Sequence, residues 1–89
     1  QVHKITEVTN ATEFKIAPSN DITEGVSLTG IGQTVTSDAF FYLTGPALDI
    51  ISMDFNRATG IATVRTYQRH GYRLNNKVRI SGATDRHWY

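Results

Sequence analysis

Aromatic and arginine side chains gather in the last third of the chain, and these residue types are the best suited to contact a partner. They can stack on bases or sugars, and they are equally enriched where two proteins meet. Of these two uses, we expect structure and assembly rather than ligand stacking. The predicted contact surface consists of Arg65, Tyr67, Arg69, Tyr72, Arg73, Arg86, Trp88 and Tyr89.

Groups that could support catalysis or bind a metal ion are poorly placed in the sequence. The chain has three histidines, His3, His70 and His87, which lack the i, i+4 spacing typical of metal ligands. We expect His70 to lie in a turn and the other two to be exposed. Asp49 and Asp54 would lie on opposite faces of a strand, which suits acid–base catalysis poorly. We therefore predict no enzymatic activity, no cofactor and no metal site.

Charge is distributed unevenly along the chain, although the net charge is only +1. Residues 1–56 carry a balance of −5 and residues 57–89 a balance of +6. The basic end could attract nucleic acid or another polyanion. Alternatively, acidic strands of the same domain or of a neighbouring subunit could neutralise it. We favour neutralisation within the protein, because basic and apolar residues alternate as they do on a sheet with one solvated face. Nucleic acid is not an expected partner.

The composition indicates one small β-rich domain. With 89 residues the chain is long enough for one domain or for one repeat of an array, and the core of such a domain is modest. The chain has no cysteine, so neither disulfides nor thiolate metal sites can support the fold. Twelve threonines favour strands over helices. No apolar run approaches the roughly 20 residues of a membrane span, so no membrane association is predicted.

Short runs of alternating apolar and polar residues, separated by turn residues, predict a β meander. The segment 48–55 is ambiguous, but its β-branched Ile50 and Ile51 favour a strand over a short helix. The predicted fold class is all-β, a small antiparallel barrel or sandwich with room for one short helical turn. The expected strands cover residues 2–8, 13–17, 26–28, 33–36, 39–43, 48–55, 61–66 and 77–81.

Turn-forming residues mark where these strands should end. Gly45 and Pro46 are expected to end the strand over 39–43. Asn75 and Asn76 tolerate positive φ, which suits a tight turn before the last strand. The inward positions of the strands predict a core that consists of Phe14, Ile16, Phe40, Tyr42, Leu48, Ile50, Val64, Val78 and Ile80.

The segment 70–83, HGYRLNNKVRISGA, resembles a β-rich module found in tail and other virion proteins of tailed bacteriophages. The pattern is a strand, then His-Gly, a short turn, and V-x-I-S-G-A; the chain departs from it at Asn75–Asn76, where glycine is commoner. The module is also similar in architecture to the small β-barrel insertion of ubiquitin-activating enzymes, which implies no shared function. The matching positions are Val64, His70, Gly71, Val78, Ile80, Ser81, Gly82 and Ala83.

The resemblance implies that residues 1–89 are a single β domain or a fragment of a longer virion protein. Residues 1–17 resemble the end of one module and residues 60–89 the start of another. The implied function is a non-enzymatic structural or assembly domain of the virion, in a tail, fibre or baseplate-associated protein. Neighbouring virion subunits are the expected partners, with the chain forming a homo-oligomer. The alternative is an adhesion module that binds a host-surface glycan or polyanion.

The two ends of the chain are expected to complete each other. Packing within one chain needs no second molecule, and it would place the acidic N-terminal part beside the basic C-terminal part. It would also cover strand edges that otherwise invite aggregation. We therefore predict that Phe14 lies close to Val78 and Ile80.

Overall fold

The computed structural model describes residues 2–18, 27–29, 33–39 and 42–82. Every regular element in these ranges is a strand, as the β-branched, alternating sequence favours. Within the same ranges, no helix is long and apolar enough to cross a membrane. The strands are β1 His3–Asn10, β2 Glu13–Ile16, β3 Ser27–Thr29, β4 Thr34–Ala39, β5 Tyr42–Asn56, β6 Ile61–Thr66 and β7 Lys77–Ser81.

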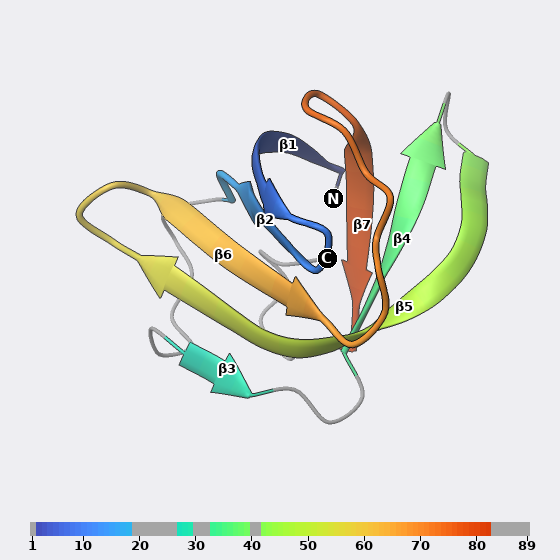
Figure 1. Ribbon diagram of the computed structural model, residues 1–89. Coiled ribbons are helices and arrows are strands. Elements are labelled where there is room, and N and C mark those ends of the chain that lie inside the picture. Colours follow the sequence, from blue (N-terminus) through green and yellow to red (C-terminus); the bar gives the residue numbers. More distant parts are fainter. Residues whose placement is uncertain (1, 19–26, 30–32, 40–41, 83–89) are drawn as a thin grey trace.

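Six of these strands form an antiparallel barrel that closes on itself (Figure 1). Neighbouring strands follow the order β5, β4, β7, β1, β2 and β6, and β6 pairs with β5 to complete the ring. β3 extends the sheet along the other edge of β5, where Ser27 is opposite Asp54. The prediction of an all-β fold, with a barrel as one of its two forms, is confirmed.

β5 closes the barrel because its two halves pair with different neighbours. Residues 42–49 pair with β4, and residues 50–56 pair with β6. The single strand expected over 39–43 is divided between two strands in the structure. Ala39 ends β4, Tyr42 begins β5, and the two residues are partners across the ladder.

The expectation that Gly45 and Pro46 end a strand is wrong, because β5 continues through them. Residues 45–47 lie opposite Thr36 alone, which makes this part of β5 a bulge. Proline has no N–H to donate to a ladder and is therefore tolerated at a bulge. The Gly-Pro pair thus interrupts the pairing locally without ending the strand.

A second bulge in β5 changes which residues face the core. Ile51 is an extra residue between two positions that pair with β6, and it is exposed. The extra residue shifts the alternation by one position, so Met53 and Phe55 are buried. Asp49 and Asp54 consequently both face outward, and the expectation that they lie on opposite faces is wrong.

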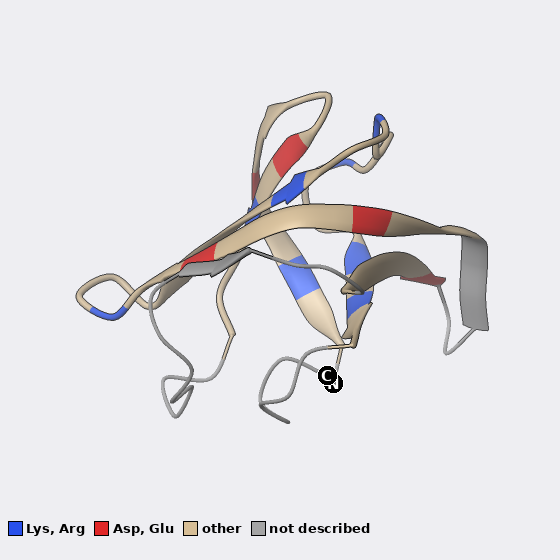
Figure 2. Ribbon diagram, turned by 90° about the horizontal axis from the view of Figure 1, so that it is seen from below, with Lys and Arg blue, Asp and Glu red and all other residues tan. Residues whose placement is uncertain are grey.

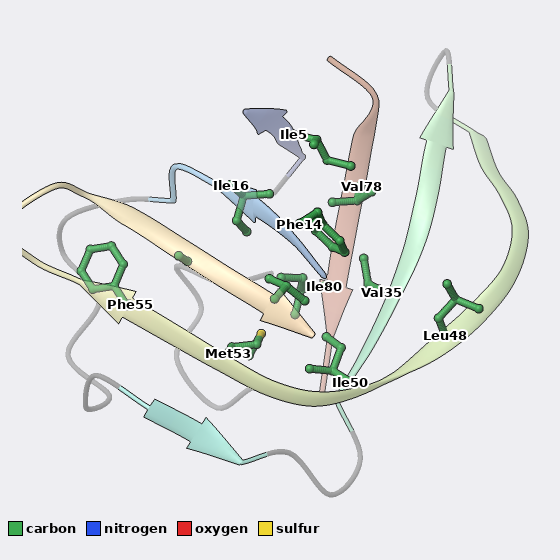
Figure 3. Packing of buried hydrophobic residues seen from close by; sticks show 12 residues of the cluster. Ile5, Phe14, Ile16, Val35, Leu48, Ile50, Met53, Phe55, Val78 and Ile80 are labelled. Carbon is green, nitrogen blue, oxygen red and sulfur yellow. The ribbon is translucent and has the colours of Figure 1, made fainter. Parts of the chain in front are cut away.

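The core fills the barrel interior. Figure 3 shows Phe14 in the middle of the barrel, with Ile16 from its own strand and Val78 and Ile80 from β7 around it. Every predicted core residue whose side chain the structure describes is buried; Phe40 and the side chain of Tyr42 lie outside the description. The buried hydrophobic residues are Ile5, Phe14, Ile16, Val35, Leu48, Ile50, Met53, Phe55, Ala62, Val64, Val78 and Ile80.

The N-terminal and C-terminal strands pair within the same chain, as predicted. Phe14 of β2 is opposite Val64 of β6, and His3 of β1 is opposite Val78 of β7. The expectation that His3 is exposed is wrong, since only 5% of its surface is accessible. His3 shares the inward face of β1 with Ile5, two residues along the strand.

Candidate contact surface

The predicted contact residues fall into three groups in the structure. Tyr67, Arg69 and Arg73 are exposed on the connection between β6 and β7, residues 67–76. Arg65 and Tyr72 make contacts within the domain, as described below. Arg86, Trp88 and Tyr89 lie outside the described residues.

Arg65 joins three strands on the outer face of the barrel. Its Nε donates to Glu13 Oε1 of β2 at 2.7 Å, and its Nη1 donates to Asp54 Oδ2 of β5 at 2.7 Å. The same Nη1 lies 3.3 Å from Ser52 Oγ. The pKa of Arg65 is raised, mainly by the hydrogen bond to Asp54. Burial lowers this pKa, but the negative charge of Glu13 raises it further, so the net change is a rise. Arg65 therefore serves the fold, with its guanidinium held by two carboxylates.

Acidic and basic residues interleave over the barrel and are not separated into two regions (Figure 2). Lys15 Nζ lies 3.2 Å from Glu7 Oε2, and Arg79 forms an ion pair with the buried carboxylate of Asp38. The Arg79–Asp38 pair and the Arg65 network link the acidic first part of the chain to the basic last part, whereas the Lys15–Glu7 pair lies within the first part. The predicted neutralisation within the protein is confirmed for Arg65 and Arg79.

A concavity of about 880 Å³ lies on this outer face. Its walls come from β1, β2, β5, β6 and the β5–β6 turn, and they carry charges of both signs beside hydroxyl and amide groups. Such a surface offers hydrogen bonds to a polar ligand rather than a field of one sign. The residues that line it are Thr6, Glu7, Lys15, Asp54, Phe55, Asn56, Arg57, Thr59, Ile61 and Thr63.

His70 fastens the β6–β7 connection to the turn between β1 and β2. Its Nε2 lies 2.7 Å from the carbonyl oxygen of Asn10, and its backbone N–H donates to Ala11 O at 2.9 Å. The Tyr72 N–H donates to His70 Nδ1 at 2.8 Å. Because Nδ1 accepts, Nε2 carries the proton and donates. The sequence predicted a histidine in a turn; the structure instead places His70 in the irregular part of the connection, before the turn at residues 74–75, and buries it.

Three aromatic rings meet where this connection covers the core. Phe14 makes edge-on contacts with His70 and Tyr72, with ring centroids 5.3 Å and 5.5 Å away. The rings of His70 and Tyr72 stack at 5.2 Å. Between them, Gly71 has a φ of 66°, which residues with a side chain rarely adopt. The His-Gly-Tyr sequence therefore closes one side of the barrel core.

The Tyr72 hydroxyl is buried and has no hydrogen-bond partner among the described residues. Burial raises the pKa of Tyr72 above its ordinary value of 10.0. An unpartnered buried hydroxyl destabilises the folded state, because its hydrogen bonds to water are lost on folding.

We expect Tyr72→Phe to raise the free energy of unfolding by about 1 kcal/mol, since it removes that hydroxyl and keeps the ring contacts. In the parent, the unfolded chain ionises first as the pH rises past about 10, so stability falls there; in the variant this fall is reduced. Urea denaturation at neutral and alkaline pH measures both effects. Tyr67→Phe is the control, because the Tyr67 side chain is exposed and should change neither. A destabilised Tyr72→Phe variant would show that the hydroxyl has a partner.

The exposed part of the connection carries apolar side chains among its arginines. Tyr67 is 65% exposed and Leu74 is 57% exposed. The Tyr67 N–H donates to Asp49 O, which places Tyr67 opposite Asp49, two residues before the exposed bulge residue Ile51 of β5. Leu74 was not among the predicted contact residues; the signal for it was an apolar residue within a polar turn.

Neither a metal site nor an acid–base pair emerges from the part of the chain described. No group of three or more His, Asp or Glu side chains gathers there as metal ligands would. Asp49 and Asp54 share the outer face, but Asp54 is bound to Arg65.

Comparisons with known proteins add no relative to this picture. A scan against protein-family models finds no match, and searches of the curated proteins and of the solved structures find none either. The resemblance to the phage virion module therefore rests on the residues quoted for it, and it is carried forward as a proposal.

Proposed function

We propose that this chain is a non-enzymatic structural domain of a phage virion, which assembles with neighbouring copies of itself. The observation that carries the proposal is that residues of the phage-module pattern have structural roles in this fold. His70 fastens the β6–β7 connection, while Val78 and Ile80 fill the barrel core. The residues that carry the resemblance therefore stabilise the fold. This is what we expect of a domain whose role is structural.

The exposed residues of the connection supply a contact for such assembly. Tyr67, Ile51 and Arg69 lie at or beside the end of β6 and are exposed. Tyrosine and arginine dominate the energetics of protein interfaces because they combine a large contact area with hydrogen bonds. This surface therefore fits a contact between subunits of the virion.

A second candidate is an adhesion module that binds a host-surface glycan. The observation that favours it is the concavity on the outer face, whose volume falls within the range of small-ligand sites. Its hydroxyl, amide and carboxylate groups can exchange hydrogen bonds with sugar hydroxyls. This candidate predicts a monomer that binds glycans and loses that binding on Thr63→Val.

Native mass spectrometry over a range of micromolar concentrations tests the assembly proposal. We expect an oligomer that is a trimer or larger, and we expect Tyr67→Ser to shift the population toward the monomer, because it removes the exposed aromatic contact. Val8→Ser is the matched control, since Val8 is also apolar and exposed but lies on β1. A parent chain that stays monomeric throughout would overturn the proposal.

A further inference from the structure

Two lysines with like charge lie directly opposite each other on β1 and β7. Lys4 and Lys77 are register partners, and both are exposed. The neighbouring Ile5 N–H donates to Asn76 O at 2.8 Å, and hydrogen-bonded and non-hydrogen-bonded pairs alternate along an antiparallel ladder. Lys4 and Lys77 therefore occupy a non-hydrogen-bonded pair, in which side chains approach most closely. Like charges placed in this way repel and destabilise the pairing.

The other outward-facing cations of the strands differ from this pair because they have carboxylate partners. Lys15, Arg65 and Arg79 each have a carboxylate within ion-pair distance. Lys4 and Lys77 have none among the residues that the structure describes. Among the described residues, the other strand cations are thus neutralised, and one adjacent lysine pair is left uncompensated.

Apolar side chains flank this lysine pair. Val2 is 40% exposed and precedes Lys4 on the same outward face. Leu74 is 57% exposed, and the next residue donates its N–H to Ile5 O at 3.0 Å, which places Leu74 beside β1. We name the four residues Val2, Lys4, Leu74 and Lys77 the lysine surface. It combines two ammonium groups with two aliphatic side chains.

We propose that the lysine surface binds an acidic segment of another protein, in which carboxylates alternate with apolar side chains. Two carboxylates would neutralise the ammonium pair and relieve its repulsion, while the apolar residues would cover Val2 and Leu74. Within the described residues the flanking side chains are aliphatic, so they give no aromatic platform for bases or sugars. The inference goes beyond the proposed assembly with copies of this chain, because it adds a second partner of stated chemistry.

Fluorescence anisotropy with a labelled, soluble copolymer of glutamate and tyrosine tests this proposal on the full chain. We expect saturable binding that weakens about threefold in Lys4→Gln or Lys77→Gln and about tenfold in the double variant. Arg57→Gln, which removes one exposed charge from the β5–β6 turn, is the matched control and should change the affinity little. Circular dichroism checks that each variant is folded.

Two further probes give the outcomes that would overturn the proposal. Heparin and a single-stranded oligonucleotide carry dense negative charge without apolar side chains. If either binds more tightly than the copolymer and depends on the same lysines, the surface is a polyanion site. If the copolymer does not bind, or binds with no loss in the double variant, the proposal is wrong.

The variant Lys77→Glu separates this inference from the proposed function. It replaces the repulsion with a cross-strand ion pair, so we expect a higher melting temperature together with loss of copolymer binding. An unchanged or lower melting temperature would contradict the assigned repulsion. A monomeric parent that binds the copolymer would overturn the assembly proposal alone, and an oligomeric parent that ignores the copolymer would overturn the inference alone.

Discussion

Phe14→Ala is expected to lower the free energy of unfolding by about 3–5 kcal/mol. The Phe14 side chain is completely buried, and it contacts the rings of both His70 and Tyr72. Its removal leaves a cavity at the centre of the barrel and deprives both rings of their edge-on partner. Small domains have a total stability of about 5–15 kcal/mol, with the smallest at the low end. We therefore expect most of the variant to be unfolded at 37 °C.

Urea denaturation followed by circular dichroism measures this loss. Val8→Ala is the matched control, because Val8 is paired with Phe14 across β1 and β2 but is 38% exposed. We expect the control to change stability by less than about 1 kcal/mol. A Phe14→Ala variant that unfolds at the parent's urea concentration would mean that the barrel core is not packed around this ring.

His70→Ala is expected to lower the free energy of unfolding by about 2–4 kcal/mol. The substitution leaves the Asn10 carbonyl and the Tyr72 N–H without the partners that the imidazole gives them. It also removes one of the three rings that meet over the core. The connection 67–76 should then detach from the β1–β2 turn.

Hydrogen exchange of the connection and thermal unfolding test this role of His70. We expect faster exchange of the residue 70 amide, which donates to Ala11 O in the parent, while amides in the β5–β6 ladder stay protected. Arg69→Ala changes the exposed neighbour and should affect neither measurement. Nitrogen NMR should report the neutral tautomer with the proton on Nε2. A proton on Nδ1 would contradict the hydrogen bond from Tyr72.

Local patterns in the sequence were sufficient to predict most of the strands and most of the core residues. Alternation in β6 and β7 identified Val64, Val78 and Ile80 as inward residues, because the pleat places every second side chain on the same face. The Asn75–Asn76 turn was also readable, and Asn75 has a φ of 71°. These features depend on short stretches of chain, so the residues next to each position are enough to predict them.

Features that depend on a partner strand could not be predicted from the sequence. The two bulges of β5 exist because β4 and β6 offer fewer residues than β5 does. Pro46 therefore signalled the end of a strand when read alone, and the alternation placed Asp49 and Asp54 on opposite faces. A bulge is a mismatch between two segments, and one segment does not reveal it.

In the candidate site, too, some features were predictable from the sequence and others depend on distant strands. The sequence selected Tyr67, Arg69 and Arg73 by residue type, and the structure exposes all three. It also selected Arg65, whose carboxylate partner Glu13 is 52 residues away in the chain.

By itself, the sequence determined that this is a small β domain with a polar outside, a modest core and an arginine-rich last third. Only the tertiary structure decided that the barrel closes through β5, that His70 is a buried fastener, and that Lys4 lies opposite Lys77. The physical reason is that alternation and turn chemistry act between neighbours along the chain. Barrel closure, ion pairing and the His70–Asn10 contact, which spans 60 residues, are set when distant strands meet.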